Sequence, residues 1–159
     1  MTADLQLPPK RLGESRVTLA QLMQPEHANT LGNVHGGWIM KLVDEAGALA
    51  CMRHAQKRVV TVAIDSMSFR RPIRIGDLVT LTAEVTLAGR TSMEVEVEVL
   101  AENPLSGEPT QTNKAYLVYV ALGEDGRPAR VPPLVAENAE QESRLEAARR
   151  RQERRLQNN

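Results

Sequence analysis

A change of hydrophobic period after about residue 54 constrains the fold more than any other feature of the sequence. Between Gly37 and about His54, apolar residues recur at spacings of three and four, which is typical of one face of a helix. Beyond it, apolar residues alternate with other residues, as they do in strands. Strands are expected over residues 16–23, 59–69, 78–87, 92–100 and 112–122. This order predicts an α+β fold in which an antiparallel sheet rolls around one long helix.

The strand expected over residues 92–100 has the clearest alternation. Met93 and the three valines that follow it are expected to face the core, and Glu94, Glu96 and Glu98 are expected to face water. A sheet of such strands has open edges, which natural proteins pair or protect. We therefore expect the chain to associate with itself through the sheet.

The two ends of the chain differ in composition from the middle. Residues 1–15 are polar and include Pro8, Pro9 and Gly13, so a flexible arm is expected there. Residues 16–135 are expected to form a single domain. Residues 136–159 are mostly charged, and acids precede arginines, which suits a helix dipole. Because no apolar stripe runs along this segment, we expect a solvated or frayed helix.

Composition excludes several classes of function. The 20 basic and 20 acidic residues balance, so neither nucleic acid nor an anionic membrane is an expected partner. No apolar run is long enough to span a bilayer, and Cys51 is the only cysteine, so we expect a cytoplasmic protein without disulfides or membrane insertion. The three histidines lack paired spacing and no nucleotide-binding motif is present, so neither a metal nor a cofactor is expected.

Polar residues gather immediately before the helix, in the segment PEHANTLGNVHGG that ends at Gly37. The exposed N–H groups at a helix start form a small positive site, and a glycine pair lets another molecule approach the backbone. Such a site could polarise a carbonyl whose oxygen gains charge during a reaction. The residues alone also allow a structural interpretation, in which Asn29 and Asn33 form turns and His35 caps the helix.

Asp44 lies about two turns into the helix, beside its apolar face, where small or apolar residues such as Met40, Gly47 and Ala48 surround it. A carboxylate in such a place is a candidate base or nucleophile, and it is equally a candidate for a boundary acid in an interface hydrogen bond. Glu45 follows Lys41 by four residues and is expected to form a surface pair.

At this point the chain resembles a known family. PEHANTLGNVHGGWIMKLVDEAGALA is similar to the active-site segment of hotdog acyl-CoA thioesterases of the YciA and brain acyl-CoA hydrolase type. The resemblance continues through VTVAIDSMSFRRPIRIGDLV, GRTSMEVEVEV, TNKAYLVYVAL and VPPLV, and covers Arg16 to about Arg155 in order. It implies a hotdog fold, with a five- to six-stranded sheet wrapped around a central helix, followed by a charged C-terminal helix.

The resemblance implies an enzyme that hydrolyses acyl-CoA to CoA and a carboxylic acid. The family's catalytic aspartate falls on Asp44, its asparagine on Asn29, and the glycine that offers an N–H to the thioester carbonyl on Gly37. Because this aspartate and asparagine act across a dimer interface in the family, homodimers are expected, and a hexamer built as a trimer of dimers. Candidate substrate-binding residues are His35, Gly36, Arg70, Arg90, Thr91, Ser92 and Lys114.

Two alternatives stay open at this stage. Hotdog hydratases and dehydratases use a histidine just before the helix paired with an acid, and His35 with Asp44 or Glu45 could imitate that arrangement. A non-catalytic acyl-CoA-binding module is the other alternative, against which the presence of both Asn29 and Asp44 argues.

Overall fold

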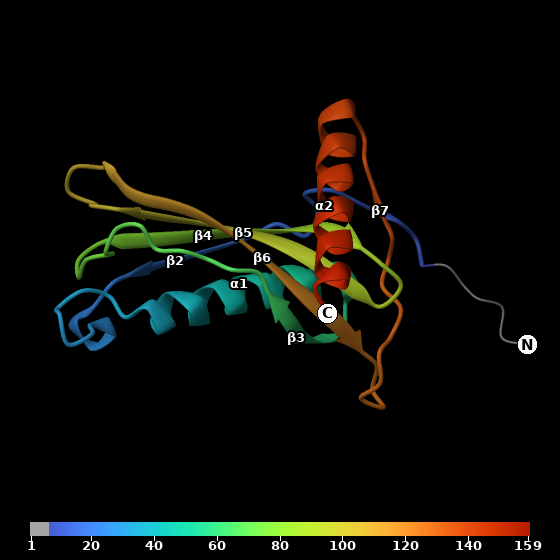
Figure 1. Cartoon of the computed structure of the whole chain (residues 1–159), viewed down its shortest axis with the longest axis horizontal. Coiled ribbons are helices and arrows are strands. Elements are labelled where there is room, and N and C mark those ends of the chain that lie inside the picture. Colours follow the sequence, from blue (N-terminus) through green and yellow to red (C-terminus); the bar gives the residue numbers. More distant parts are fainter. Residues whose placement is uncertain (1–6) are drawn as a thin grey trace, which may run out of the picture.

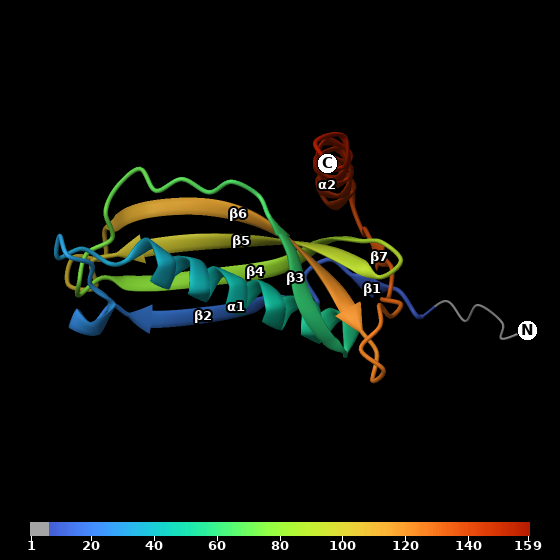
Figure 2. The ribbon, with the colours of Figure 1, turned by 60° about the horizontal axis from the view of Figure 1, so that its bottom comes forward.

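The computed structural model describes residues 7–159, and its architecture is one helix wrapped by an antiparallel sheet (Figure 1). Five strands are hydrogen-bonded in the order β2-β4-β5-β6-β3, and the sheet curves around α1 (Figure 2). The expected α+β architecture is confirmed. The elements are β1 (Lys10–Arg11), β2 (Val17–Leu22), the 3-10 helix η1 (Pro25–His27), α1 (Gly36–Ala55), β3 (Arg58–Ile64), β4 (Leu78–Ala88), β5 (Ser92–Glu102), β6 (Pro109–Leu122), β7 (Leu134–Val135) and α2 (Ala139–Gln157).

The core lies between α1 and the concave face of the sheet. The helix residues predicted from the three-and-four spacing are all buried there: Ile39, Leu42, Val43, Ala46 and Ala50. They meet inward-facing residues of β4, β5 and β6, which include Leu81, Val97 and Leu117. Because both layers contribute aliphatic side chains of modest size, α1 can lie close to the strands.

The edge strand β3 is shorter than expected, and the face expected to be buried is the exposed one. It ends at Ile64, and the apolar residues that mark it in the sequence face away from the helix. Val60, Val62 and Ile64 are 42%, 53% and 45% exposed. Thr61 instead faces α1, and the strand register shifts immediately after it, as at a β-bulge. The sheet therefore presents exposed apolar side chains along one edge.

The N-terminal segment is docked from Lys10 onward, which differs from the flexible arm expected over residues 1–15. β1 pairs in parallel with β7, and Leu12 and Ser15 are buried. The Lys10 ammonium donates to the carbonyl oxygen of His54, at 2.7 Å, near the C-terminal end of α1. A cation there satisfies helix carbonyls, so polar residues of the arm find partners on the domain. Residues 1–6 lie outside the described part of the chain.

The charged C-terminal helix α2 crosses the strands on the face of the sheet opposite α1 (Figures 1 and 2). Its own residues Leu145 and Ala148 face the sheet and are buried. Arg144 pairs with Glu84 at 3.0 Å, and Arg151 pairs with Glu94 at 2.8 Å.

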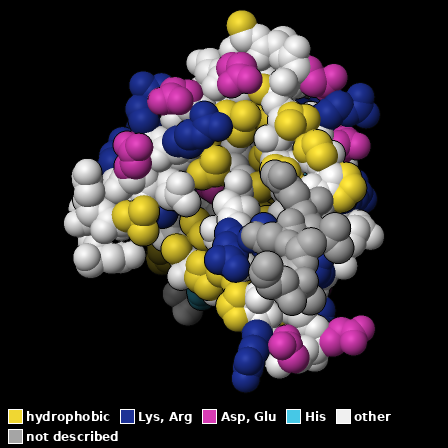
Figure 3. Space-filling view, turned by 90° about the vertical axis from the view of Figure 1, so that its right-hand side faces the viewer, with side chains coloured by type: hydrophobic (Ala, Val, Ile, Leu, Met, Phe, Trp, Pro, Cys, Tyr) yellow, Lys and Arg dark blue, Asp and Glu magenta, His cyan; other side chains and the backbone are white. Residues whose placement is uncertain are grey.

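The structure differs from two expectations about this region: one side of α2 is packed on the sheet while its other side is exposed, and Glu94 does not face water. Glu94 is only 2% exposed and accepts hydrogen bonds from Arg151, Arg155 and Thr86. The paired guanidinium groups compensate for the carboxylate's lost hydration. Ion pairs therefore help to hold α2 on the sheet, where other helices rely on an apolar stripe. On the face shown in Figure 3, acidic and basic side chains are likewise interspersed around exposed apolar ones.

Removing the buried carboxylate should destabilise the protein strongly. We expect Glu94→Ala to lower the free energy of unfolding by about 3 kcal/mol, because Arg151 and Arg155 lose their partner at a partly buried site. Glu98→Ala is the matched control, since Glu98 lies on the same strand and is exposed; it should change stability by less than about 0.5 kcal/mol. Urea unfolding at one protein concentration measures both. Equal effects would contradict the role of Glu94 in holding α2.

His54 makes stability depend on pH. It is fully buried, its Nε2–H donates to the Pro132 carbonyl oxygen at 2.7 Å, and its Nδ1 has no partner among the described residues. Burial lowers the pKa of His54 from 6.5, and the Lys10 charge lowers it further, whereas the Pro132 bond and Glu14 oppose the shift. Near pH 6.5 His54 binds a proton in the unfolded chain but not in the folded chain. The free energy of unfolding therefore decreases as the pH falls below that value.

We expect the free energy of unfolding to fall between about pH 7.5 and about pH 5.5, and to fall less in His54→Gln, which cannot titrate. Urea unfolding at both pH values gives the difference. Parallel pH profiles for the two proteins would rule out His54 as a source of the dependence.

Candidate active site

The loop before α1 is held rigidly against the helix. The His27 ring is buried and stacks on Trp38 with ring centroids 4.2 Å apart, and the His27 carbonyl accepts from the His35 N–H at 2.8 Å. The Val34 N–H donates to the Ile73 carbonyl at 2.8 Å, which ties the loop to the segment before β4. These contacts fix where α1 begins.

His35 caps the helix, as the structural interpretation of the sequence expected. Its Nδ1 accepts the Gly37 N–H at 2.9 Å, so Nε2 carries the proton of the neutral ring. The Gly36 N–H has no acceptor within the described residues. The start of α1 therefore offers one open N–H, while that of Gly37 becomes available to another molecule only when the imidazole moves.

Asn29 forms the turn that precedes the helix and also borders a cavity. Its Oδ1 accepts from the N–H groups of Leu31, at 2.9 Å, and Asn33, at 3.2 Å, so its amide NH₂ is left to donate elsewhere. The adjacent cavity measures about 160 Å³ and is lined by Asn29, Asn33, Val34, Gly36, Ile39, Phe69, Arg71, Pro72 and Ile73. Arg71 beside this cavity was missed by the sequence reasoning, which named only the neighbouring Arg70.

Asp44 is bound through one carboxylate oxygen. Its Oδ1 accepts from the Thr61 hydroxyl at 2.7 Å and from the Tyr119 hydroxyl at 2.9 Å. Its Oδ2 has no hydrogen-bond partner among residues 7–159. Thr61 and Tyr119 are opposite each other in the β3–β6 pair, which places both donors on the helix side of the sheet. Neither donor was found from the sequence; a polar residue within the apolar run VVTVAI was the only available signal.

A single chain does not bring Asn29 and Asp44 together. Asp44 follows Gly36 by eight residues, which is about 12 Å along the helix axis. No contact joins the two side chains in the described structure. The chain therefore holds two candidate half-sites: an amide group with a helix start, and a carboxylate held by two hydroxyls.

The candidate cations and hydroxyls for CoA are spread over the surface. Arg70 precedes β4, and Arg90 and Thr91 lie in the β4–β5 turn. Ser92 begins β5, and Lys114 lies on β6 beside Glu96, at 3.9 Å. Ser92 is opposite Val120 and Lys114 is opposite Glu98, so they are about 20 Å apart along the strands. One phosphate group cannot contact them all.

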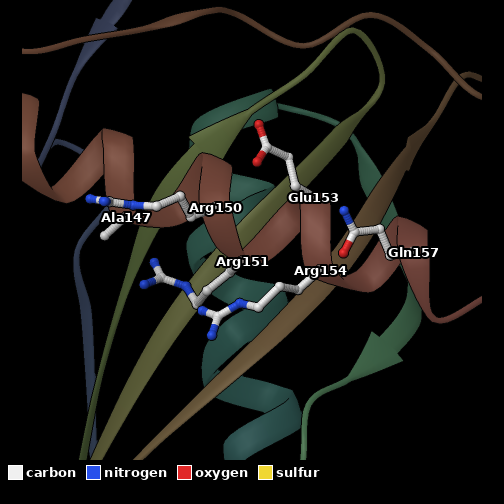
Figure 4. Close-up of a pocket in the computed structure, with 6 residues that line it drawn as sticks. All are labelled: Ala147, Arg150, Arg151, Glu153, Arg154 and Gln157. Carbon is white, nitrogen blue, oxygen red and sulfur yellow. The ribbon is translucent and has the colours of Figure 1, made fainter.

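Two further hollows lie beside α2. A groove of about 570 Å³ runs between the end of α2 and strands β3 and β6, and includes Ser92, Asp65 and Arg155. A hollow of about 410 Å³ lies on α2 itself and is lined by Ala147, Arg150, Arg151, Glu153, Arg154 and Gln157 (Figure 4). Neither contains Asp44 or Asn29.

Within residues 7–159, no three His, Cys, Asp or Glu side chains are grouped so that they could hold a metal ion. No helix of this part of the chain is long and apolar enough to cross a membrane. Burial raises the pKa of the Cys51 thiol, which keeps it protonated in the core.

Comparison with known proteins places this chain in one class. Residues 31–108 match the family model of the thioesterase superfamily. Cytosolic acyl coenzyme A thioester hydrolase of Mus musculus is 40% identical over 134 residues, which are 79% of this chain and 35% of that one. Acyl-CoA thioester hydrolase YciA of Salmonella typhimurium is 34% identical over 123 residues, 75% of this chain and 92% of that one.

Solved structures agree with these relatives. An apo-hexameric acyl-CoA thioesterase superimposes with a TM-score of 0.89 at 38% identity, covering 96% of this chain and 97% of that one. An acyl-CoA hydrolase from Staphylococcus aureus, in complex with butyryl-CoA, CoA and CoA disulfide, has a TM-score of 0.85 at 32% identity, covering 95% and 92%. Structures of that enzyme also exist with an aspartate, an asparagine or a threonine replaced by alanine.

The chain therefore belongs to the thioesterase superfamily and, within it, to the family of acyl-CoA thioester hydrolases. The hotdog fold implied by the resemblance is confirmed.

Proposed function

We propose that this protein hydrolyses acyl-CoA thioesters to CoA and a carboxylic acid, at a site that two subunits share. The observation that carries the proposal is the geometry of Asp44, whose Oδ1 is held by two hydroxyls while Oδ2 stays open. A carboxylate fixed in this way can act on a water molecule or on a carbonyl carbon without first reorganising.

In the proposed reaction, the thioester carbonyl lies at the start of α1 from one subunit and Asp44 comes from the partner subunit. Oδ2 of Asp44 either removes a proton from the attacking water or attacks the carbonyl carbon itself, giving an anhydride that water then opens. N–H groups at the helix start stabilise the oxyanion, and Gly37 is the proposed donor once the His35 imidazole has moved off its N–H. The C–S bond breaks when the tetrahedral intermediate collapses, which on the nucleophilic route is the step that forms the anhydride, and the CoA sulfur leaves and takes up a proton.

Asn29 fits the role of a donor in this site. Two backbone N–H groups occupy its Oδ1, so its NH₂ can donate to the thioester carbonyl or orient the water. The aspartate and asparagine replaced in the S. aureus enzyme are fifteen positions apart, and its threonine follows the aspartate by seventeen. Asn29, Asp44 and Thr61 have the same two spacings, which supports the assignment of these residues.

Self-association is proposed on the edge strand β3. Its outward apolar side chains and its open backbone edge suit pairing with a second copy of the chain. A hexamer built as a trimer of dimers is the proposed assembly, since a structural relative at 38% identity is described as hexameric. The mouse relative is called cytosolic, which supports a proposed cytoplasmic location.

The proposed contacts to CoA phosphates are Arg70, Arg90 and Lys114, helped by the hydroxyls of Thr91 and Ser92, and each bound CoA can use only some of them. A hydratase or dehydratase is disfavoured by the described contacts. His35 Nδ1 binds the Gly37 N–H, Glu45 pairs with Lys41 at 2.8 Å, and Asp44 binds Thr61 and Tyr119. Within the described residues, His35 therefore pairs with neither of the two acids that a hydratase site would need.

Release of free thiol from acyl-CoA tests the function directly. Incubation with acyl-CoA of several chain lengths and a thiol reagent should show CoA release, and Asp44→Asn should lower kcat by about 100- to 10 000-fold. The control is Glu45→Gln, the next residue on the same helix, whose exposed pair with Lys41 takes no part in the reaction. Addition of water to the acyl chain without thiol release, or full activity of Asp44→Asn, would overturn the proposal.

Mixing two inactive variants tests the shared site. Asn29→Ala and Asp44→Asn are each expected to be nearly inactive, but random pairing of their subunits should restore about a quarter of the wild-type sites, because one intact half comes from each chain. Activity is measured after the two proteins are mixed under conditions that exchange subunits, and light scattering reports the assembly. No recovery in a mixture with proven exchange, or an active monomer, would show that one chain holds the whole site.

A further inference from the structure

Tyr119 is the second donor to Asp44, and the geometry points to it as the residue that positions this carboxylate for catalysis. This inference rests on the proposed function, in which Asp44 reacts with the thioester or with water. We infer that the Tyr119 hydroxyl fixes Oδ1 and the helix backbone at the same time, so that Oδ2 is the reacting oxygen.

The hydroxyl of Tyr119 makes two contacts with the same residue. It lies 2.9 Å from Oδ1 of Asp44 and 2.9 Å from the backbone carbonyl oxygen of Asp44. Because the phenol has one proton, the two acceptors share it in a bifurcated hydrogen bond, which restrains both the side chain and the helix turn that carries it. Together they hold the carboxylate relative to strand β6, which lies inside the sheet and is paired on both sides.

The environment of Tyr119 makes it a better anchor than Thr61. Tyr119 has no exposed surface, whereas Thr61 is exposed and belongs to the edge strand β3. Burial raises the pKa of the Tyr119 phenol, and the hydrogen bond to Asp44 raises it further. The phenol therefore stays a neutral donor at any pH at which the enzyme works.

Gly47 makes the approach of the phenol possible. It lies one turn after Asp44 on α1, and a Cβ at this position would lie 2.6 Å from the Tyr119 hydroxyl oxygen and 3.0 Å from Cγ1 of Val95. Real Cβ atoms do not approach another atom to 2.6 Å, so any larger residue at position 47 would displace the phenol from Asp44. The lack of a side chain at Gly47 is therefore what allows the Tyr119 hydroxyl to reach Asp44.

The test is Tyr119→Phe in the full chain, with acyl-CoA as the substrate. Loss of one oxygen should lower kcat by about 10- to 100-fold, because the carboxylate is no longer held in the reactive geometry, and should leave KM within about twofold. Tyr116→Phe is the matched control: it removes the same atom from a tyrosine three residues away, whose hydroxyl donates to Glu96 at 2.9 Å on the other face. The control should keep the wild-type kcat.

A double-variant cycle separates positioning from general damage. Gly47→Ala should lower kcat in the wild type, and should lower it much less in the Tyr119→Phe background, where no hydroxyl remains to be displaced. Independent, additive losses would mean that Gly47→Ala acts by disturbing the core, and would overturn the link between the two residues.

A crystal structure of Tyr119→Phe reads the position of Asp44 without turnover. Asp44 is expected to occupy more than one side-chain conformation in the variant and a single one in the wild type. An unmoved, single Asp44 side chain, or a kcat equal to that of Tyr116→Phe, overturns the positioning role. Failure of the wild type to release CoA from any acyl-CoA would instead overturn the proposed function, and the crystal structure would still decide the role of Tyr119.

Discussion

The burial of one face of α1 against the concave sheet is the constraint on which the rest of the structure depends. Five aliphatic positions of the helix must face the strands, and this fixes the rotation of the helix about its axis. Asp44 lies beside that face, so its carboxylate is directed to the border of the core. There it meets inward-facing residues of β3 and β6, and the hydroxyls that bind it are therefore set by the same packing.

The two faces of the sheet are covered by different physical means. On the concave face, apolar burial holds α1. On the opposite face, arginines of α2 pair with Glu84 and Glu94, which are 6% and 2% exposed. A buried carboxylate is costly without a cation and acceptable with one, so α2 and these strands depend on each other. The arrangement also leaves β3 uncovered at its edge, next to the end of α2.

Periodicity predicted the elements well because each has one face in the core. It placed α1 within one residue at each end, and it identified the valines of β5 as buried. It misjudged Glu94 because the covering helix contributes charge, which an apolar pattern cannot reveal. It missed Thr61 because both faces of β3 carry apolar residues, so the pattern does not tell which face is inside. Tyr119 could not be assigned to Asp44 because that contact depends on the register between β3 and β6, which alternation does not specify.

The length of α1, and not the conformation of any side chain, separates Asn29 from Asp44. Eight residues of helix hold the amino-terminal N–H groups about 12 Å from the carboxylate, and no rotamer change can close that distance within one chain. In a dimer with a two-fold axis, the start of each α1 can lie beside the middle of the partner's α1. The helix start and the carboxylate then come together at two equivalent places. In the proposed shared site, the same rigidity that keeps Asp44 in place requires a second subunit to supply the other half.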